Sequence, residues 1–202
     1  MTWIRTIPLD KATGELRSLY QRIKGPNHTV DNIMMAHSLR PHSMEGHLAL
    51  YKAVLHHRDN ALPRWFLEAL GLYVSMLNSC GYCVQHHYEG MRRLLKDDAR
   101  SQATREALEC GNPQDSFNGK ELAAMRYAQA LTRNPAEVTE EQISSLREAG
   151  LDDGEILEIN QLVSYFAYAN RMVLGLGVTT KGDVLGLSPS SDNPEDWSHR
   201  WE

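Results

Sequence analysis

Residues 64–96 carry the pattern that decides the fold, and they read RWFLEALGLYVSMLNSCGYCVQHHYEGMRRLLK. The spacing of the apolar residues predicts one helix over about 64–77 and a second helix over about 80–96. The Asn-Ser pair at 78–79 can end the first helix and cap the second, because such side chains accept hydrogen bonds from exposed N–H groups. The stretch therefore predicts a helical hairpin with Cys80 at its tip.

The remainder of the chain has the same helical period, and we find no stretch that alternates with a period of two over a strand's length. We therefore expect an all-α protein in which residues 1–187 form a single helical domain. Residues 188–202 are polar and rich in turn formers, which predicts a frayed tail, whereas Trp197 and Trp201 favour an arm that docks on a partner subunit.

Start and stop signals bound the other expected helices. Two capping boxes, Thr139 with Gln142 and Asp152 with Glu155, indicate helix starts. The longest apolar face lies in Leu151–Leu176. The remaining helices are expected from Asp10 to Gly25-Pro26, at Val30–His37, at Ser43–His57, from a cap at Asp98 to Cys110, and at Lys120–Arg133.

The composition excludes several classes of protein. The chain has 202 residues, and no apolar run approaches the roughly 18 residues that span a bilayer, so we expect no membrane segment. The first residues carry acids and helix breakers where a secretory signal needs an unbroken apolar stretch, so we expect a cytoplasmic protein. The net charge is -5 and the basic residues are dispersed among the acidic ones, which argues against nucleic acid as a partner.

The chemistry-bearing residues gather around the hairpin tip. Cys80 and Cys83 are three residues apart, so on a helix their Cα atoms lie about 5 Å apart, within disulfide range. His87 lies one helical turn beyond Cys83 on the same face. Glu68 precedes the tip by about eleven residues and His87 follows it by about eight, which at ~1.5 Å per residue are depths of roughly 16 and 12 Å, so antiparallel packing brings the two to about the same level.

A pair of thiols next to a base is suited to redox chemistry. Only the thiolate attacks a peroxide or a disulfide, and a helix N-terminus and a nearby imidazole both favour the anion. Once one sulfur is oxidised to a sulfenic acid, the second sulfur can condense with it to form a disulfide. A dithiol reductant then restores the pair.

The spacing of Glu68, eleven residues, Cys80-x-x-Cys83, three residues and His87 resembles the signature of the AhpD-like alkylhydroperoxidases in the carboxymuconolactone decarboxylase superfamily. It is most similar to the branch labelled peroxidase-related enzymes, in which Cys-x-Tyr-Cys followed by paired histidines is common. The stretches LTRNPAEVTEEQISSLREAGLDDGEILEI and YFAYANRMVLGLGV are similar to later helices of the superfamily, so the resemblance covers most of residues 10–187.

The resemblance implies an all-helical, AhpD-like bundle that assembles into dimers, trimers or hexamers and needs no bound cofactor or metal. It implies a hydroperoxide as substrate and a lipoyl- or thioredoxin-type dithiol as reductant. Glu68, Cys80, Cys83 and His87 fall on the family's proton relay and redox pair, with Cys83 as the peroxidatic and Cys80 as the resolving cysteine. By position alone, Cys80 at the tip is expected to be the more exposed sulfur. The chain has Tyr82 where the AhpD motif has a second histidine, which shortens the relay.

Other interpretations of the same residues remain open at this point. Cys80, Cys83 and His87 could supply three ligands to zinc in a structural or interaction module. A decarboxylase-type or lactone-acting enzyme of the same superfamily is the enzymatic alternative, although such enzymes generally lack the cysteine pair. Glu68 could be a solvated helix residue. We expect His86 to lie on another face of its helix and Cys110 to be an inert thiol. Two groups are expected to have structural roles. The histidines expected to be structural or at the surface are His28, His37, His42, His47, His56 and His57, and the residues expected in the core and a subunit interface rather than a pocket are Tyr165, Phe166, Tyr168, Asn170 and Arg171.

Overall fold

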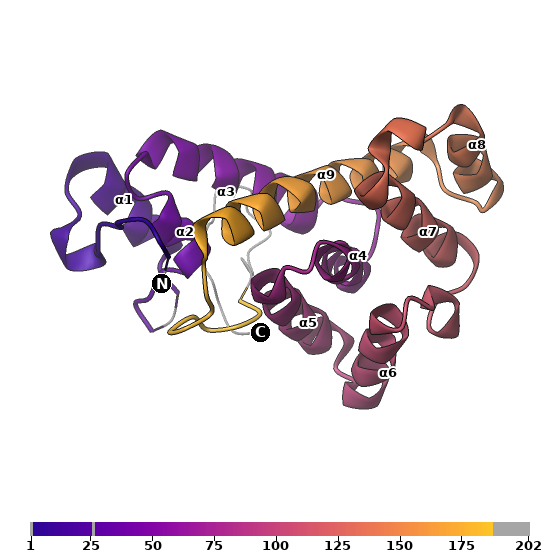
Figure 1. Ribbon diagram of the computed structural model, residues 1–202, viewed down its shortest axis with the longest axis horizontal. Helices are drawn as coiled ribbons and strands as arrows, with labels where there is room; N and C mark the ends of the chain where they lie inside the picture. Colours follow the sequence, from indigo (N-terminus) through magenta and orange to yellow (C-terminus); the bar gives the residue numbers. More distant parts are fainter. Residues whose placement is uncertain (1, 26, 188–202) are drawn as a thin grey trace.

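The computed structural model describes residues 2–25 and 27–187, and every regular element in these ranges is a helix, as the periodicity predicted (Figure 1). The tail or docking arm expected at 188–202 lies outside the described residues. In chain order the elements are η1 (Leu9–Lys11), α1 (Gly14–Ile23), α2 (Asn32–Ala36), α3 (Pro41–His56), α4 (Arg64–Leu77), α5 (Gly81–Leu95), α6 (Asp98–Glu109), η2 (Pro113–Asp115), α7 (Gly119–Arg133), η3 (Pro135–Glu137), α8 (Glu140–Glu148) and α9 (Asp153–Leu176).

Helix α4 is the centre of the larger core. All of its residues from Phe66 to Ser75 are buried, which is the behaviour of a helix that is enclosed on every side. Figure 1 shows α4 enclosed by α5, α6, α7 and α9, and residues of these helices form one contiguous apolar cluster with it. Glu68 is therefore carried into the interior on a rigid element.

The 24-residue helix α9 crosses the middle of the molecule, from the side of α7 and α8 to the side of α2 and α3 (Figure 1). It contacts α7 and α8 toward its N-terminal end and α2 and α3 toward its C-terminal end, and its contacts with α4 extend as far as Asn170. A second apolar cluster at the latter end is formed chiefly by α1, α2 and α3. The buried face of α1 comprises Leu16, Leu19, Tyr20 and Ile23.

The turn between α4 and α5 forms the hairpin tip. Asn78 ends α4, and Ser79 adopts a left-handed conformation with φ of 57°, which reverses the chain direction. Cys80 is then the N-cap residue of α5. The prediction that Asn78 or Ser79 caps α5 was wrong, because the reversal takes two residues and α5 starts only after Cys80.

The other predicted caps lie at the starts of α6, α8 and α9. Both capping boxes are present, at the starts of α8 and α9. The cap of α6 is Asp97 rather than the expected Asp98, because the Asp97 carboxylate accepts a hydrogen bond from the N–H of Arg100. Among the described residues, no helix combines the length and the apolar character needed to cross a membrane.

After α9 the chain returns across the hairpin. Gly177 ends the helix with a positive φ of 60°, and the following segment, 178–187, runs back toward α2 and α5. The carboxylate of Asp183 in this segment accepts hydrogen bonds from the N–H of Asn32 and from the hydroxyl of Tyr82. These bonds hold segment 178–187 against the face of α5 that carries the cysteines.

Candidate active site

The two cysteines lie side by side at the start of α5. Cys80 is the N-cap residue, and Cys83 lies in the first turn. Their sulfur atoms are 3.2 Å apart, and both thiols are free and buried. The pair therefore shares a hydrogen bond as a dithiol, and its helical spacing is compatible with a disulfide.

The surroundings favour a negative charge on Cys80 over one on Cys83. Hydrogen bonding from the Cys83 thiol, and then from the backbone N–H of Cys83 and the Asn170 side chain, lowers the pKa of Cys80 against the opposing effect of burial. Hydrogen bonding with Cys80 and burial both raise the pKa of Cys83 well above its usual value. The first proton lost from the pair therefore leaves the anion on Cys80.

In the part of the chain that the structure describes, the two sulfurs differ in their contact with the cavity. Cys83 lines a cavity of about 70 Å³, whereas Cys80 does not, and its exposed fraction is 0%. The expectation that Cys80 is the more exposed sulfur was wrong. The tip of the hairpin is covered, because Cys80 packs in an apolar cluster with residues such as Val173 of α9 and Val178 of segment 178–187.

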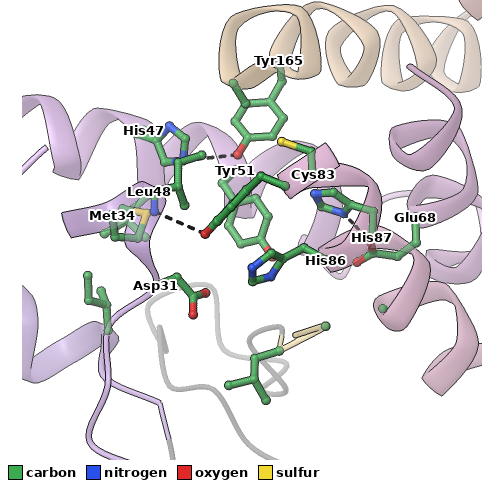
Figure 2. Close-up of a pocket in the computed structure, with 17 residues that line it drawn as sticks. Asp31, Met34, His47, Leu48, Tyr51, Glu68, Cys83, His86, His87 and Tyr165 are labelled. Atoms are coloured by element: carbon green, nitrogen blue, oxygen red, sulfur yellow. Dashed lines mark hydrogen bonds and ion pairs between the residues drawn. The ribbon is translucent and has the colours of Figure 1, made fainter. Parts of the chain in front are cut away.

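Glu68 and His87 form a buried acid–base pair next to Cys83. Oε2 of Glu68 on α4 lies 2.6 Å from Nδ1 of His87 on α5, which is the contact that the hairpin argument predicted (Figure 2). Glu68 is only 3% exposed, so the alternative that it is a solvated residue was wrong. Because Nδ1 of His87 is engaged by Glu68, Nε2 is the nitrogen that remains for proton transfer at the cavity.

Two glycines make room for this pair. A Cβ atom at Gly90, three residues after His87 on α5, would lie 2.9 Å from the carboxyl carbon of Glu68. A Cβ atom at Gly71 on α4 would collide with the ring of Phe166, which packs edge-on against His87 at a centroid distance of 4.5 Å. Glycine, which has no Cβ atom, is therefore needed at both positions for Glu68, His87 and Phe166 to pack as they do.

Several residues that the sequence assigned elsewhere form the cavity wall. His86 was expected on another face of its helix, and His47 was expected to be structural or superficial, but both line the cavity (Figure 2). Tyr165 is core, as expected, yet it also lines the cavity, and its hydroxyl lies 3.3 Å from Nε2 of His47. Tyr51 of α3 completes this aromatic side, and burial raises its pKa well above its usual value.

A second group of charged residues lies on the side of the cavity formed by α2 and segment 178–187. The buried Asp183 carboxylate accepts the Tyr82 hydroxyl hydrogen bond at 2.7 Å and lies 3.4 Å from Nε2 of His86. Asp31, which precedes α2, also lines the cavity. Its pKa is raised to about 6, first by burial and further by the charge of Asp183, while His86 opposes the shift. Neither aspartate was predicted from the sequence to belong to the site.

The zinc interpretation finds no supporting geometry in the described part of the chain. In residues 2–25 and 27–187, no group of three or more His, Cys, Asp or Glu side chains is arranged to hold a metal ion. In particular, Nδ1 of His87 is directed at Glu68. Cys110, the third cysteine, is exposed at the end of α6 and lies in no such group.

Comparisons with known proteins identify the fold. No protein-family model matches the sequence, and no curated protein matches it. A solved structure from Ralstonia eutropha, described as an alkylhydroperoxidase AhpD core and an uncharacterized peroxidase-related protein, has a TM-score of 0.78 at 20% identity, covering 90% of this chain and 93% of that one. An uncharacterized peroxidase-related protein from a Silicibacter species gives 0.78 at 21% identity, with the same coverage of 90% and 93%.

A structure of a different activity shares the architecture. The debrominase Bmp8 has a TM-score of 0.69 at 18% identity, covering 90% of this chain and 91% of that one. These likenesses establish an AhpD-like, all-helical fold for the chain, as the motif spacing predicted. Since proteins of one fold can differ in chemistry, the activity must be argued from the site itself.

Proposed function

We propose that this AhpD-like chain is a thiol peroxidase that reduces hydroperoxides through a dithiol–disulfide cycle of Cys80 and Cys83. One turnover converts ROOH and the two thiols into ROH, water and the Cys80–Cys83 disulfide. The observation that carries the proposal is the 3.2 Å sulfur pair placed beside a cavity and next to the Glu68–His87 pair. An external dithiol, of lipoyl or thioredoxin type, then reduces the disulfide and closes the cycle.

Access decides which sulfur attacks. The anion of the resting pair is favoured on Cys80, but a peroxide in the cavity meets Cys83. Attack therefore requires the Cys83 proton to leave, and His87 one helical turn away accepts it, directly or through a water. Glu68 at Nδ1 supports His87, because its carboxylate stabilises the imidazolium that forms.

The second step uses the neighbouring thiol. Attack by the Cys83 thiolate on the peroxide breaks the O–O bond and leaves a sulfenic acid on Cys83. The Cys80 sulfur, whose lowered pKa favours the thiolate, attacks this sulfenic sulfur, and hydroxide leaves and is protonated to water. A resolving sulfur already in contact with the oxidised one limits further, irreversible oxidation.

Self-association is part of the proposal. Leu157 and Tyr168 are 55% and 42% exposed on α9, and they are eleven residues apart, so they lie on the same side of the helix. Large apolar side chains on one helix face favour contact with a second copy of the chain over contact with water. We therefore propose a homo-oligomer, as the resemblance implied, and light scattering of the purified protein measures its size.

Single-cysteine variants test the proposed cycle. Cys83→Ser is expected to abolish dithiol-dependent peroxide consumption while leaving the fold intact. Cys80→Ser is expected to retain one peroxide equivalent of reaction and to accumulate a sulfenic acid on Cys83 that dimedone traps. Full turnover by Cys83→Ser, or a dimedone adduct on Cys80 in that variant, contradicts the assignment of roles.

A substrate panel tests the reaction class. The same dithiol could transfer two electrons to a carbon–bromine bond, releasing bromide and replacing bromine with hydrogen, and one structural relative is described as a debrominase. We expect hydroperoxides to oxidise the cysteine pair and a brominated pyrrole to leave it reduced. Oxidation by the bromopyrrole but by none of the hydroperoxides would refute the peroxidase proposal in favour of dehalogenation.

A further inference from the structure

Helix α5 presents two adjacent histidines to the same cavity. Cys83, His86, His87 and Gly90 all line it, and their spacing of three, four and seven residues puts them on one helix face (Figure 2). Glu68 on α4 forms a hydrogen bond with one of these histidines, His87. His86 has no role in the steps proposed above.

His86 has an available nitrogen and a defined electrostatic setting. Its Nε2 atom is buried and makes no hydrogen bond with any residue that the structure describes. That atom lies 3.4 Å from the Asp183 carboxylate, and the ring packs against Tyr82 at a centroid distance of 4.6 Å. Figure 2 shows the carboxyl group of Asp31 directed toward the same ring. Two carboxylates thus supply counter-charge for a proton held on His86.

Asp183 is held in place independently of His86. Its carboxylate accepts hydrogen bonds from the N–H of Asn32 at 3.1 Å and from the Tyr82 hydroxyl at 2.7 Å. These donors fix the carboxylate between α2 and α5. The arrangement parallels the neighbouring one, in which a carboxylate from another element supports His87.

Hydroperoxide reduction needs proton transfers at two different atoms. The Cys83 sulfur must lose a proton, and the oxygen that leaves must gain one, because an alkoxide is a far poorer leaving group than an alcohol. That oxygen departs on the side opposite the attacking sulfur. Tyr82, which stands where the AhpD motif has histidine, is poorly suited to donate, because burial raises its pKa well above the usual value and its hydroxyl already bonds Asp183.

We infer that His86 is a further catalytic residue, the general acid that protonates the leaving oxygen, an inference that rests on the proposed peroxidase function. The Cys83 thiolate attacks the terminal oxygen of ROOH, the O–O bond breaks, and the RO oxygen takes the proton from the His86 imidazolium as ROH forms. The Cys83 proton is meanwhile on His87. Transfer of that proton to His86, through water in the cavity, restores both histidines.

The test varies the leaving group. With tert-butyl hydroperoxide the leaving group is an alkoxide that needs a proton, whereas with peracetic acid it is acetate, a stable anion that needs none. The kcat/KM for the peroxide reports every step through O–O cleavage and does not depend on the reductant. We expect His86→Gln to lower kcat/KM by about 100-fold or more for tert-butyl hydroperoxide, the usual size of a general-acid contribution, and to leave that for peracetic acid nearly unchanged.

Two further variants define the comparison. His87→Gln is expected to lower kcat/KM for both substrates alike, because both require the Cys83 thiolate. His42→Gln, on an exposed part of α3, is expected to change neither. The rate of Cys83 alkylation by iodoacetamide, which needs no peroxide, is expected to fall in His87→Gln and to stay at the wild-type value in His86→Gln.

Several outcomes overturn the inference. An equal loss for both substrates in His86→Gln, or a fall in Cys83 alkylation, means that His86 acts structurally or on the thiol. Unchanged kcat/KM for tert-butyl hydroperoxide means that His87 or water returns the proton. If the wild-type protein reduces neither peroxide, the proposed function itself fails, and the role of His86 fails with it. If the wild-type protein reduces both peroxides and His86→Gln does so equally well, only the role of His86 fails.

Discussion

Replacing Gly90 by alanine is expected to break the hydrogen bond between Glu68 and His87 without substituting either residue. The added methyl carbon would lie 2.9 Å from both the carboxyl carbon and Oε2 of Glu68, closer than atoms of this kind approach. Glu68 is buried in the middle of α4 and the Gly90 backbone is buried on α5, so neither helix can yield freely. The carboxylate must therefore rotate away from Nδ1 of His87.

The expected change in the free energy of unfolding combines one stabilising and two destabilising effects. Glycine to alanine inside a helix normally stabilises by about 0.5–1 kcal/mol. Overpacking in a close-packed interior costs about 1–3 kcal/mol, and a lost hydrogen bond to a charged group costs about 1.5–3 kcal/mol. The net expectation is a loss of about 2–5 kcal/mol in the free energy of unfolding, together with a fall of about 10-fold or more in kcat/KM for peroxide.

The assay is a double-mutant cycle read in both stability and activity. Gly90→Ala, Glu68→Ala and the double variant are compared by thermal unfolding and by kcat/KM for tert-butyl hydroperoxide. In the Glu68→Ala background the methyl group has space, so Gly90→Ala is expected to cause little further loss. Gly175→Ala on α9, where an added Cβ meets nothing within 4 Å, serves as the control and is expected to be neutral or stabilising.

The reasoning is refuted if Gly90→Ala retains wild-type activity, or if it causes the same loss whether or not Glu68 is present. Either result means that the close approach at Gly90 does not set the position of the Glu68 carboxylate. A loss of activity in Gly175→Ala would instead show that any alanine in these helices disturbs the site.

Two further predictions concern single side chains. Asn170→Ala is expected to raise the pKa of Cys80, whose anion the amide stabilises, and the pH dependence of thiol alkylation measures the shift; an unchanged profile contradicts that role. The pKa of Asp31 is about 6 in the folded protein, against 3.8 as its ordinary value. Asp31 therefore lowers the free energy of unfolding progressively as the pH rises from about 3.8 to about 6. Asp31→Asn is accordingly expected to raise the free energy of unfolding by about 1–3 kcal/mol at about pH 8 and hardly at about pH 3, and an equal effect at both pH values contradicts the sign.

The local elements of the fold were predictable because local signals encode them. Helix α4 has the predicted bounds, Arg64–Leu77, and both capping boxes form, since each depends on residues within a few positions of one another. The contact of Glu68 with His87 was also predictable, because a short antiparallel hairpin relates the two residues by simple counting along its two helices.

The cavity was less predictable because residues from seven parts of the chain line it: α1, α2 with the residue before it, α3, α4, α5, α9 and segment 178–187. Asp31, His47 and Tyr165 lie far apart in the sequence, and only the packing of α2, α3 and α9 brings them together with Cys83. The burial of Cys80 depends on α9 and the segment after it, which no pattern at the hairpin encodes.

His86 is a different case, because a local signal existed. Three residues along a helix is a rotation of about 300°, so His86 lies only about 60° from Cys83 around α5. The same spacing rule that related Cys83 to His87 therefore also predicts His86 on the cavity face, and applying it to both histidines would have found the residue.

The most direct test of the central claim is a titration of the fully reduced protein with one equivalent of hydroperoxide, followed by mass spectrometry of the alkylated, digested chain. We expect a Cys80–Cys83 disulfide formed in a one-to-one ratio with the alcohol released, with Cys110 still a free thiol. Consumption of the peroxide with Cys80 and Cys83 both still alkylatable, or no consumption at all, would contradict it.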